Sequence, residues 1–267
     1  MKRLVSLLLL FGFLLLSASC GDSSLAVPEL IQSLRILAIQ SEPPEVAPGQ
    51  TIRLRALVVD PKNRPISLQW FRCQRTVDTG CRDKTDDKRL GNGQELRWTV
   101  PKDFLADGLK PLELLKGREL TLTLVAQAGS DYITGIKRVV VSFVPTNINP
   151  VLDKVTFRST ANTQLLPEPW SATTNQTYTF QPSLKGNPRQ KYPALTQDGN
   201  IQYVDEPLFF SWYMTAGALQ GGRNSNHAKP SKNWKAPDKA TTSRMFVIIR
   251  DGRGGTDWKE WKVQVRE

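Results

Sequence analysis

The sequence predicts an all-β protein in which two tandem antiparallel β-sandwiches follow a signal peptide. Several short segments alternate apolar and polar residues, the pattern of strands with one buried face. The 18 Gly and 18 Pro residues divide the chain into short segments, which suit strands better than long helices. Each half contains a tryptophan in mid-strand, in phase with the apolar side chains. The length of 267 residues is enough for two ordinary domains.

The first sandwich is expected over residues 31–145. Its strand candidates alternate with a period of two, except for a more continuously apolar closing strand. Residues 103–116 are expected to form a short helix that Pro111 breaks. The strand candidates of this half are residues 51–58, 66–70, 120–124 and 137–143.

The second sandwich is expected over residues 153–267, after a linker at 146–152. In its last strand Trp261, Val263 and Val265 fall on one side of the sheet and the polar residues on the other. We therefore expect each sheet to have one buried face and one face in solvent. The strand candidates of this half are residues 154–157, 177–180, 208–212, 245–249 and 261–265.

The two halves resemble each other in sequence. Residues 68–71 around Trp70 parallel 210–213 around Trp212, and residues 98–101 parallel 234–237. Immunoglobulin-like sandwiches bury such a tryptophan between their two sheets. The chain is therefore predicted to contain two immunoglobulin-like domains.

Residues 1–19 have the order of an export signal. Lys2 and Arg3 precede an apolar run at 4–16, which is short for a membrane-spanning helix, and small residues follow it. Residues 16–20, Leu-Ser-Ala-Ser-Cys, resemble the lipobox of bacterial lipoproteins. The resemblance implies cleavage before Cys20, a diacylglyceryl group on its sulfur and a lipidated tether at 20–30. In enteric bacteria, Gly21 after the cysteine would imply transfer to the outer membrane.

Two further resemblances concern the sandwiches. The glycine-rich hairpin at 246–265 resembles the closing hairpin of polycystic-kidney-disease-type and cadherin-like extracellular domains. Residues 34–60 look like the first domain of predicted lipoproteins from large-genome Gram-negative bacteria. These resemblances imply an extracytoplasmic fold and location, without a ligand.

Cys73 and Cys81 remain after lipidation of Cys20. An even pair of cysteines in an oxidising compartment predicts a disulfide that closes a short loop. A zinc site is the alternative, but it needs about four ligands. The single histidine, His227, is far away in the sequence.

Asp251 and Asp257 flank a glycine-rich turn, and two interpretations are open. Clustered carboxylates would suit Ca²⁺. Alternatively, glycine supplies positive φ and aspartate caps a hairpin turn, which Arg250 and Arg253 favour because they would repel a cation.

The residues at 184–206 form a long polar insertion, and long loops are often functional. With Trp170 and Tyr178, its Arg189, Lys191, Tyr192 and Tyr203 would make an aromatic and basic platform for a glycan or another polyanion. The alternative is an extra hairpin with residues 201–204 as one strand. A carbohydrate-binding module predicts that several of Trp170, Tyr178, Tyr192, Tyr203 and Trp258 are exposed on one face.

An enzyme is not expected. His227 lies in a polar stretch typical of a solvated loop, and no nucleophile-elbow motif accompanies it. The net charge of +11 is scattered along the chain, which predicts a basic surface suited to an anionic membrane or wall polymer. No nucleic-acid-binding motif is present. The sequence thus predicts a non-catalytic, membrane-anchored envelope lipoprotein without a cofactor, with a protein or envelope polymer as partner.

Overall fold

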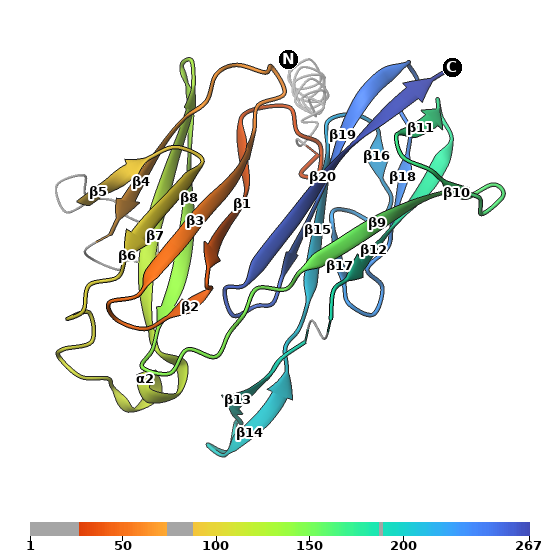
Figure 1. Cartoon of the computed structure of the whole chain (residues 1–267). Helices are drawn as coiled ribbons and strands as arrows, with labels where there is room; N and C mark the ends of the chain where they lie inside the picture. Colours follow the sequence, from red (N-terminus) through yellow and green to blue (C-terminus); the bar gives the residue numbers. More distant parts are fainter. Residues whose placement is uncertain (1–26, 74–87, 187–188) are drawn as a thin grey trace, which may run out of the picture.

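The computed structural model describes residues 27–73, 88–186 and 189–267. Two β-sandwiches account for most of this chain, and each consists of two sheets (Figure 1). One sheet of the first sandwich contains, in order, β1 (Arg35–Glu42), β3 (Thr51–Val59) and β6 (Glu95–Thr99). The other contains β2 (Glu45–Val46), β8 (Asp131–Val141), β7 (Arg118–Ala128), β4 (Ser67–Arg72) and β5 (Lys88–Asn92).

The second sandwich repeats this plan with additions. One sheet contains, in order, β10 (Leu165–Leu166), β9 (Leu152–Ser159), β12 (Thr177–Leu184), β18 (Lys232–Lys235) and β16 (Ala218–Leu219). The other contains β11 (Trp170–Thr173), β20 (Thr256–Arg266), β19 (Thr241–Arg250), β15 (Phe209–Met214) and β17 (Asn224–Asn226). A separate hairpin consists of β13 (Lys191–Leu195) and β14 (Ile201–Asp205).

The two sandwiches share one topology. In each, the chain leaves the first sheet at a cis proline, Pro43 or Pro169, and then adds a short strand to the second sheet. That short strand, β2 or β11, pairs in parallel with the last strand of its sandwich, whereas the other strand pairs are antiparallel. The predicted fold class, two tandem immunoglobulin-like sandwiches, is confirmed.

Each sandwich encloses its own core, and the predicted tryptophans lie inside. Trp70 and Trp212 are fully buried between their sheets. Trp70 Nε1 donates to Gly93 O at 2.9 Å and Trp212 Nε1 donates to Ser225 Oγ at 3.1 Å, so neither indole N–H lacks an acceptor. The two mid-strand tryptophans therefore occupy equivalent places in the two cores.

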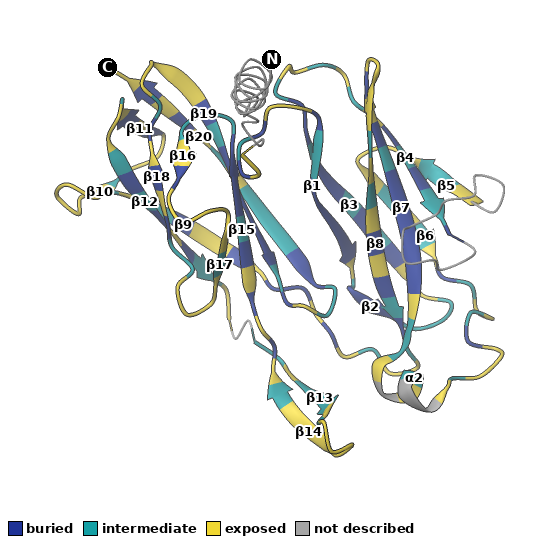
Figure 2. Ribbon diagram, turned by 180° about the vertical axis from the view of Figure 1, so that it is seen from behind, coloured by how far each residue is buried: buried dark blue, intermediate teal, exposed yellow. Residues whose placement is uncertain are grey.

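A third apolar cluster lies between the sandwiches. It joins the outer face of the β1–β3 sheet to the outer face of the β15–β19–β20 sheet, so that four sheets stack in sequence (Figures 1 and 2). The expectation that every sheet has one face in solvent is wrong for these two sheets, because each packs on both faces. The cluster contains Ile31, Leu37, Ala38, Leu57, Val59, Tyr213, Phe246 and Ile248.

The short helix differs from the expectation at its proline. Helix α2 (Pro111–Lys116) begins at Pro111 and is not broken by it. Proline is tolerated in the first turn because the N–H that it lacks has no partner there. Glu113 accepts from the Lys110 N–H at 2.8 Å and so satisfies a free backbone donor at the start of the helix.

The first described residues attach to the second sandwich. Ile31 N donates to Met214 O at 2.8 Å, and Met214 N donates to Glu29 O at 3.0 Å. Met214 ends β15, while the β13–β14 hairpin precedes the start of β15. The amino-terminal segment and the hairpin therefore lie at opposite ends of the molecule (Figure 1). Within the described ranges, no helix is both long and apolar enough to cross a membrane.

Candidate functional site

The turn between β19 and β20 is the centre of a polar junction between the sandwiches. Gly252 and Gly254 adopt φ values of 79° and 111°, which glycine tolerates best. The buried Asp251 carboxylate accepts from Arg253 N at 2.7 Å and from Gly255 N at 2.8 Å. A Cβ on Gly255 would collide with that carboxylate. Asp251 therefore caps the turn, as the hairpin interpretation predicts.

Asp257 has a different set of contacts from Asp251. Its Oδ2 accepts from Leu152 N at 2.8 Å, and burial raises the pKa of its carboxyl. Among the residues that the structure describes, no three His, Cys, Asp or Glu side chains are grouped as a metal site. The two carboxylates thus bind backbone N–H groups on different segments of the chain.

The segment that connects the sandwiches is bonded to both of them. Asn149 Nδ2 donates to Ser41 O at 2.9 Å in the first sandwich, and its Oδ1 accepts from Thr256 N at 2.8 Å in the second. Asn147 Nδ2 donates to Asp251 Oδ2 at 3.1 Å. Both asparagine side chains are buried, so these bonds hold the connection in place.

Three charged side chains extend this junction. Glu45 Oε2 accepts from the backbone N–H groups of Thr146 and Asn147, each at 2.9 Å. Arg253 reaches Glu45 at 3.4 Å with one nitrogen and Glu206 at 2.7 Å with another. Burial raises the pKa of Glu206, and the hydrogen bond from Arg253 opposes this effect. Arg253 therefore links the first sandwich, the turn and the residue that follows β14.

The base of the β13–β14 hairpin rests on this junction. The Arg253 guanidinium lies 4.7 Å from the centre of the Tyr192 ring, in cation–π contact. Gln190 Oε1 accepts from Ile148 N at 2.9 Å, and Arg189 Nε donates to Glu206 O at 3.0 Å. The hairpin is thus attached to the body through residues of β13, the connection and the turn.

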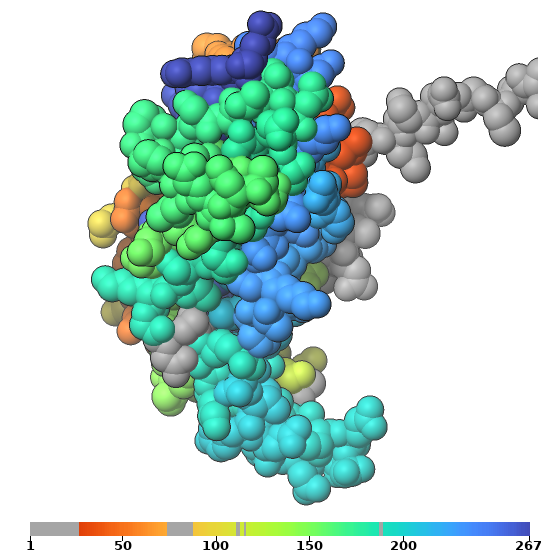
Figure 3. Space-filling view, turned by 90° about the vertical axis from the view of Figure 1, so that its right-hand side faces the viewer, coloured from red at the N-terminus to blue at the C-terminus, as the bar shows by residue number. Residues whose placement is uncertain are grey.

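The remainder of the hairpin projects from the body (Figure 3). Its exposed apolar side chains are Leu195, Ile201 and Tyr203, and Tyr203 is 72% exposed. The alternative that the insertion contains an extra hairpin, with residues 201–204 in one strand, is confirmed. A projecting hairpin with three exposed apolar side chains is a surface suited to a binding partner.

The aromatic platform that a carbohydrate-binding module would need does not form. Trp170 and Tyr178 are buried in the second core, where both stack against Phe157. Trp258 packs against the cluster between the sandwiches, and the Arg55 guanidinium lies 5.1 Å from the centre of its ring. Tyr192 is partly covered by Arg253, which leaves Tyr203 as the exposed member of the set. Trp170 and Tyr178 are in phase with the buried faces of β11 and β12, and this phase places them in the second core instead of on a shared surface.

The other residues selected from the sequence lie apart from the junction. His227 is exposed in the loop between β17 and β18, as predicted of a solvated histidine. Cys73 is buried, with its sulfur 3.2 Å from Thr123 Oγ1, and Cys81 is outside the described residues, so the disulfide stays a prediction. Cys20 and the signal peptide are likewise outside them.

Comparisons with known proteins find only remote similarity to solved structures. The sequence matches no protein-family model and no curated protein sequence. Fibronectin(III)-like modules of Clostridium thermocellum CbhA align at 14% identity over 86% of this chain and 94% of theirs, with a TM-score of 0.26. The N-terminal Ig1-2 module of the Drosophila receptor protein tyrosine phosphatase DLAR aligns at 11% identity over 88% of this chain and 100% of its own, with a TM-score of 0.28. The strand order of the two sandwiches, and not these alignments, defines the fold of the chain.

Proposed function

We propose that this chain is a non-catalytic lipoprotein of the bacterial cell envelope that displays a binding hairpin away from its membrane. The observation that carries the proposal is the position of the β13–β14 hairpin. It lies at the end of the molecule opposite the residues that would follow the lipidated Cys20 (Figure 1). A protein or an envelope polymer is the proposed partner of the hairpin.

The rigidity of the body supports this proposal. The apolar cluster between the sandwiches and the buried Asn149 bonds oppose bending at the connection. A body that does not bend keeps its far end away from a surface to which its other end is anchored. Each buried CH₂ of a lipid contributes about 0.8 kcal/mol, so the two or three acyl chains of a lipoprotein hold it stably at a bilayer. The outer membrane is the proposed location in a Gram-negative source.

The anchor is tested by mass spectrometry of the chain expressed in a Gram-negative host. We expect the amino-terminal peptide to begin at Cys20 and to carry the added mass of acyl chains. The variant Cys20→Ala should lose that mass and leave the membrane fraction. An unmodified amino-terminal peptide in the native chain would contradict the anchor.

The hairpin is tested by photocrosslinking in the native envelope. A photoreactive amino acid replaces Tyr203, and the control replaces Tyr132 in β8, which is similarly exposed at 76%. Tyr132 directly follows the turn between β7 and β8. This turn lies at the opposite end of the molecule from the hairpin (Figure 1). We expect a defined crosslinked product from position 203 alone. The same product from position 132, or none from position 203, would contradict the assignment of the hairpin as the binding element.

A further inference from the structure

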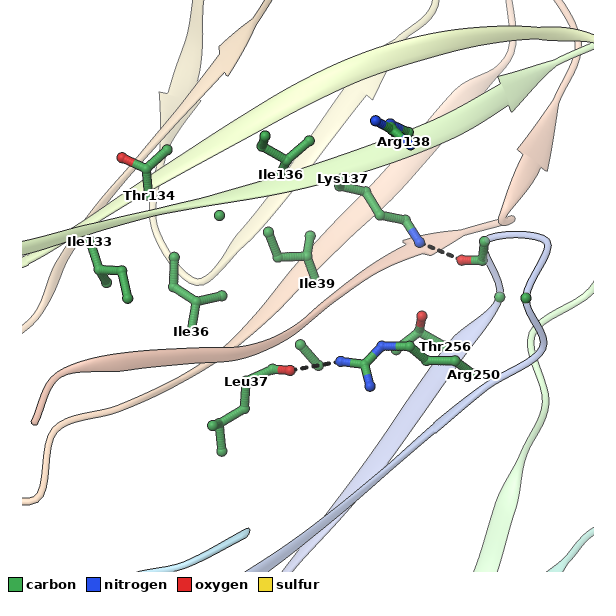
Figure 4. A pocket seen from close by; sticks show the side chains of 15 residues that line it. Ile36, Leu37, Ile39, Ile133, Thr134, Ile136, Lys137, Arg138, Arg250 and Thr256 are labelled. Atoms are coloured by element: carbon green, nitrogen blue, oxygen red, sulfur yellow. Dashed lines mark hydrogen bonds between the residues drawn. The ribbon is translucent and has the colours of Figure 1, made fainter. Parts of the chain in front are cut away.

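A cavity of about 470 Å³ opens between β1, β8 and the turn that joins β19 to β20 (Figure 4). Its size is in the range of roughly 300–1,000 Å³ that is usual for ligand pockets. Ile36, Ile39 and Ile133 make one side of it apolar. Gly135 lies against Ile36 and Ile39 so closely that a Cβ there would be 3.0 Å from Ile36 Cδ1. The apolar side is therefore packed tightly around the backbone of β8.

The opposite side of the cavity carries one buried and one partly buried cation. Lys137 is 6% exposed, and its Nζ donates to Gly254 O. Arg250 donates to Leu37 O at 2.9 Å and to Ser211 Oγ at 3.3 Å. These acceptors are neutral, and within residues 27–73, 88–186 and 189–267 neither cation has a carboxylate within ion-pair distance.

Burial disfavours the charged form of both cations. It lowers the pKa of Lys137 to about 8, although the charge of Asp251 acts to raise that pKa and Arg250 acts to lower it. Burial likewise lowers the pKa of Arg250. A desolvated cation is stabilised by an anion that hydrogen-bonds to it. The cavity thus combines an apolar side with a side that favours a negative group.

The edge of β8 beside the cavity also offers backbone hydrogen-bonding groups. β8 pairs with β7 along its whole length, but with β2 only at Val140 and Val141. Ser142 N donates to Val46 O at 3.0 Å, which identifies the edge that faces β2. Because backbone groups alternate along a strand, those of Thr134 and Ile136 point to the same edge. In the described chain no strand pairs with them there, so an extended peptide can add at this edge.

We propose that this cavity binds the carboxy-terminal end of an extended peptide whose last residue is apolar. The terminal carboxylate lies between Lys137 and Arg250, and the last side chain packs against Ile36 and Ile39. The backbone of the peptide bonds to the free edge of β8. A free fatty acid would satisfy the cations and the apolar side, but it would leave the edge of β8 unused. The inference does not depend on the lipid anchor or on the hairpin.

The test is calorimetric titration of the full chain in mild detergent. The probe is an acetylated tetrapeptide of threonine and valine that ends in leucine, with either a free carboxylate or a carboxamide. We expect the carboxamide to bind about ten-fold more weakly, because it loses charged hydrogen bonds. Lys137→Met should weaken binding of the free acid by a similar factor. Lys154→Met is the matched control, because Lys154 is an exposed cation on β9, and it should leave binding unchanged.

Three results would overturn the proposal. One is equal affinity for the acid and the carboxamide. Another is the absence of binding by either peptide at millimolar concentration. The third is binding of octanoate as tight as that of the free acid, which would assign the site to fatty acids. The comparison of acid and carboxamide uses the native chain, so it holds even where Lys137→Met fails to fold.

Discussion

Arg253 donates a hydrogen bond of 2.7 Å to the buried carboxylate of Glu206, and its guanidinium lies over the ring of Tyr192 at the same time. The turn between β19 and β20 is thereby connected to both ends of the hairpin insertion. In the sequence, Arg253 and Glu206 are 47 residues apart. Together with the hydrogen bonds of Gln190 and Arg189, this contact attaches the projecting hairpin to the body.

Replacing Arg253 by methionine should therefore destabilise the protein and loosen the hairpin. Glu206 would keep a buried carboxylate without its cation, and such a change costs about 3–5 kcal/mol. Urea unfolding measures the loss, and hydrogen exchange should become faster in β13 and β14. Arg53→Met is the matched control, because Arg53 and Glu95 form an exposed pair worth less than about 1 kcal/mol. Equal losses in the two variants would contradict the role of Arg253.

The Asp60–Arg64 pair predicts a loss of stability in acid. The side-chain hydrogen bond from Arg64 lowers the pKa of Asp60 from 3.8 to about 2. When the pKa of a carboxyl group is lower in the folded state than in the unfolded chain, the ionised group stabilises the fold. This stabilisation is complete at a pH above the pKa of the unfolded chain, and it is lost as the pH falls through the pKa of the folded state. The difference in Tm between the native chain and Asp60→Asn should shrink between pH 4 and pH 2. A difference that stays constant over this range would contradict the assignment.

The cluster between the sandwiches predicts that both unfold together. Phe246 is fully buried in this cluster, and Phe246→Ala should cost about 3–5 kcal/mol. Calorimetry should show one transition for the native chain and two separated transitions for the variant. Phe209→Ala, at an exposed position of β15, is the control and should keep the single transition. Two transitions in the native chain would show that the sandwiches are independent.

The predicted disulfide has a chemical test. Alkylation of the unfolded, unreduced chain should leave Cys73 and Cys81 unmodified, and prior reduction should expose both. On the chain-entropy model the closed loop contributes roughly 2.5 kcal/mol, so Cys81→Ser should lower the free energy of unfolding by about that amount. Labelling of both cysteines without reduction would exclude the bond.

The sequence predicted the sandwiches better than their arrangement. Alternation around Trp70 and Trp212 depends on local residues, and it identified strands that the structure contains. The runs at 36–39 and 246–249 are apolar at every position, which is the signal of a strand buried on both faces. That signal would have revealed the cluster between the sandwiches, although it does not say which surfaces meet.

The polar junction was beyond sequence reasoning for a physical reason. Asn147 and Asn149 occur in a stretch that has the composition of an ordinary linker, and their burial depends on the approach of two distant turns. Lys137 stands at the start of the strand expected at 137–143 and looks like one of many surface cations, whereas the fold places it within β8 and covers it. The Asp251 turn cap could be predicted, because it depends on neighbouring residues alone.

Energy transfer to a dye in the lipid bilayer tests the orientation of the anchored protein most directly. Donor fluorophores are placed at position 132 or at position 203 of the lipidated chain in vesicles. We predict strong transfer from position 132, at the anchored end, and weak transfer from position 203, on the projecting hairpin. Equal transfer from both positions, or stronger transfer from position 203, would contradict a protein that holds its hairpin away from the membrane.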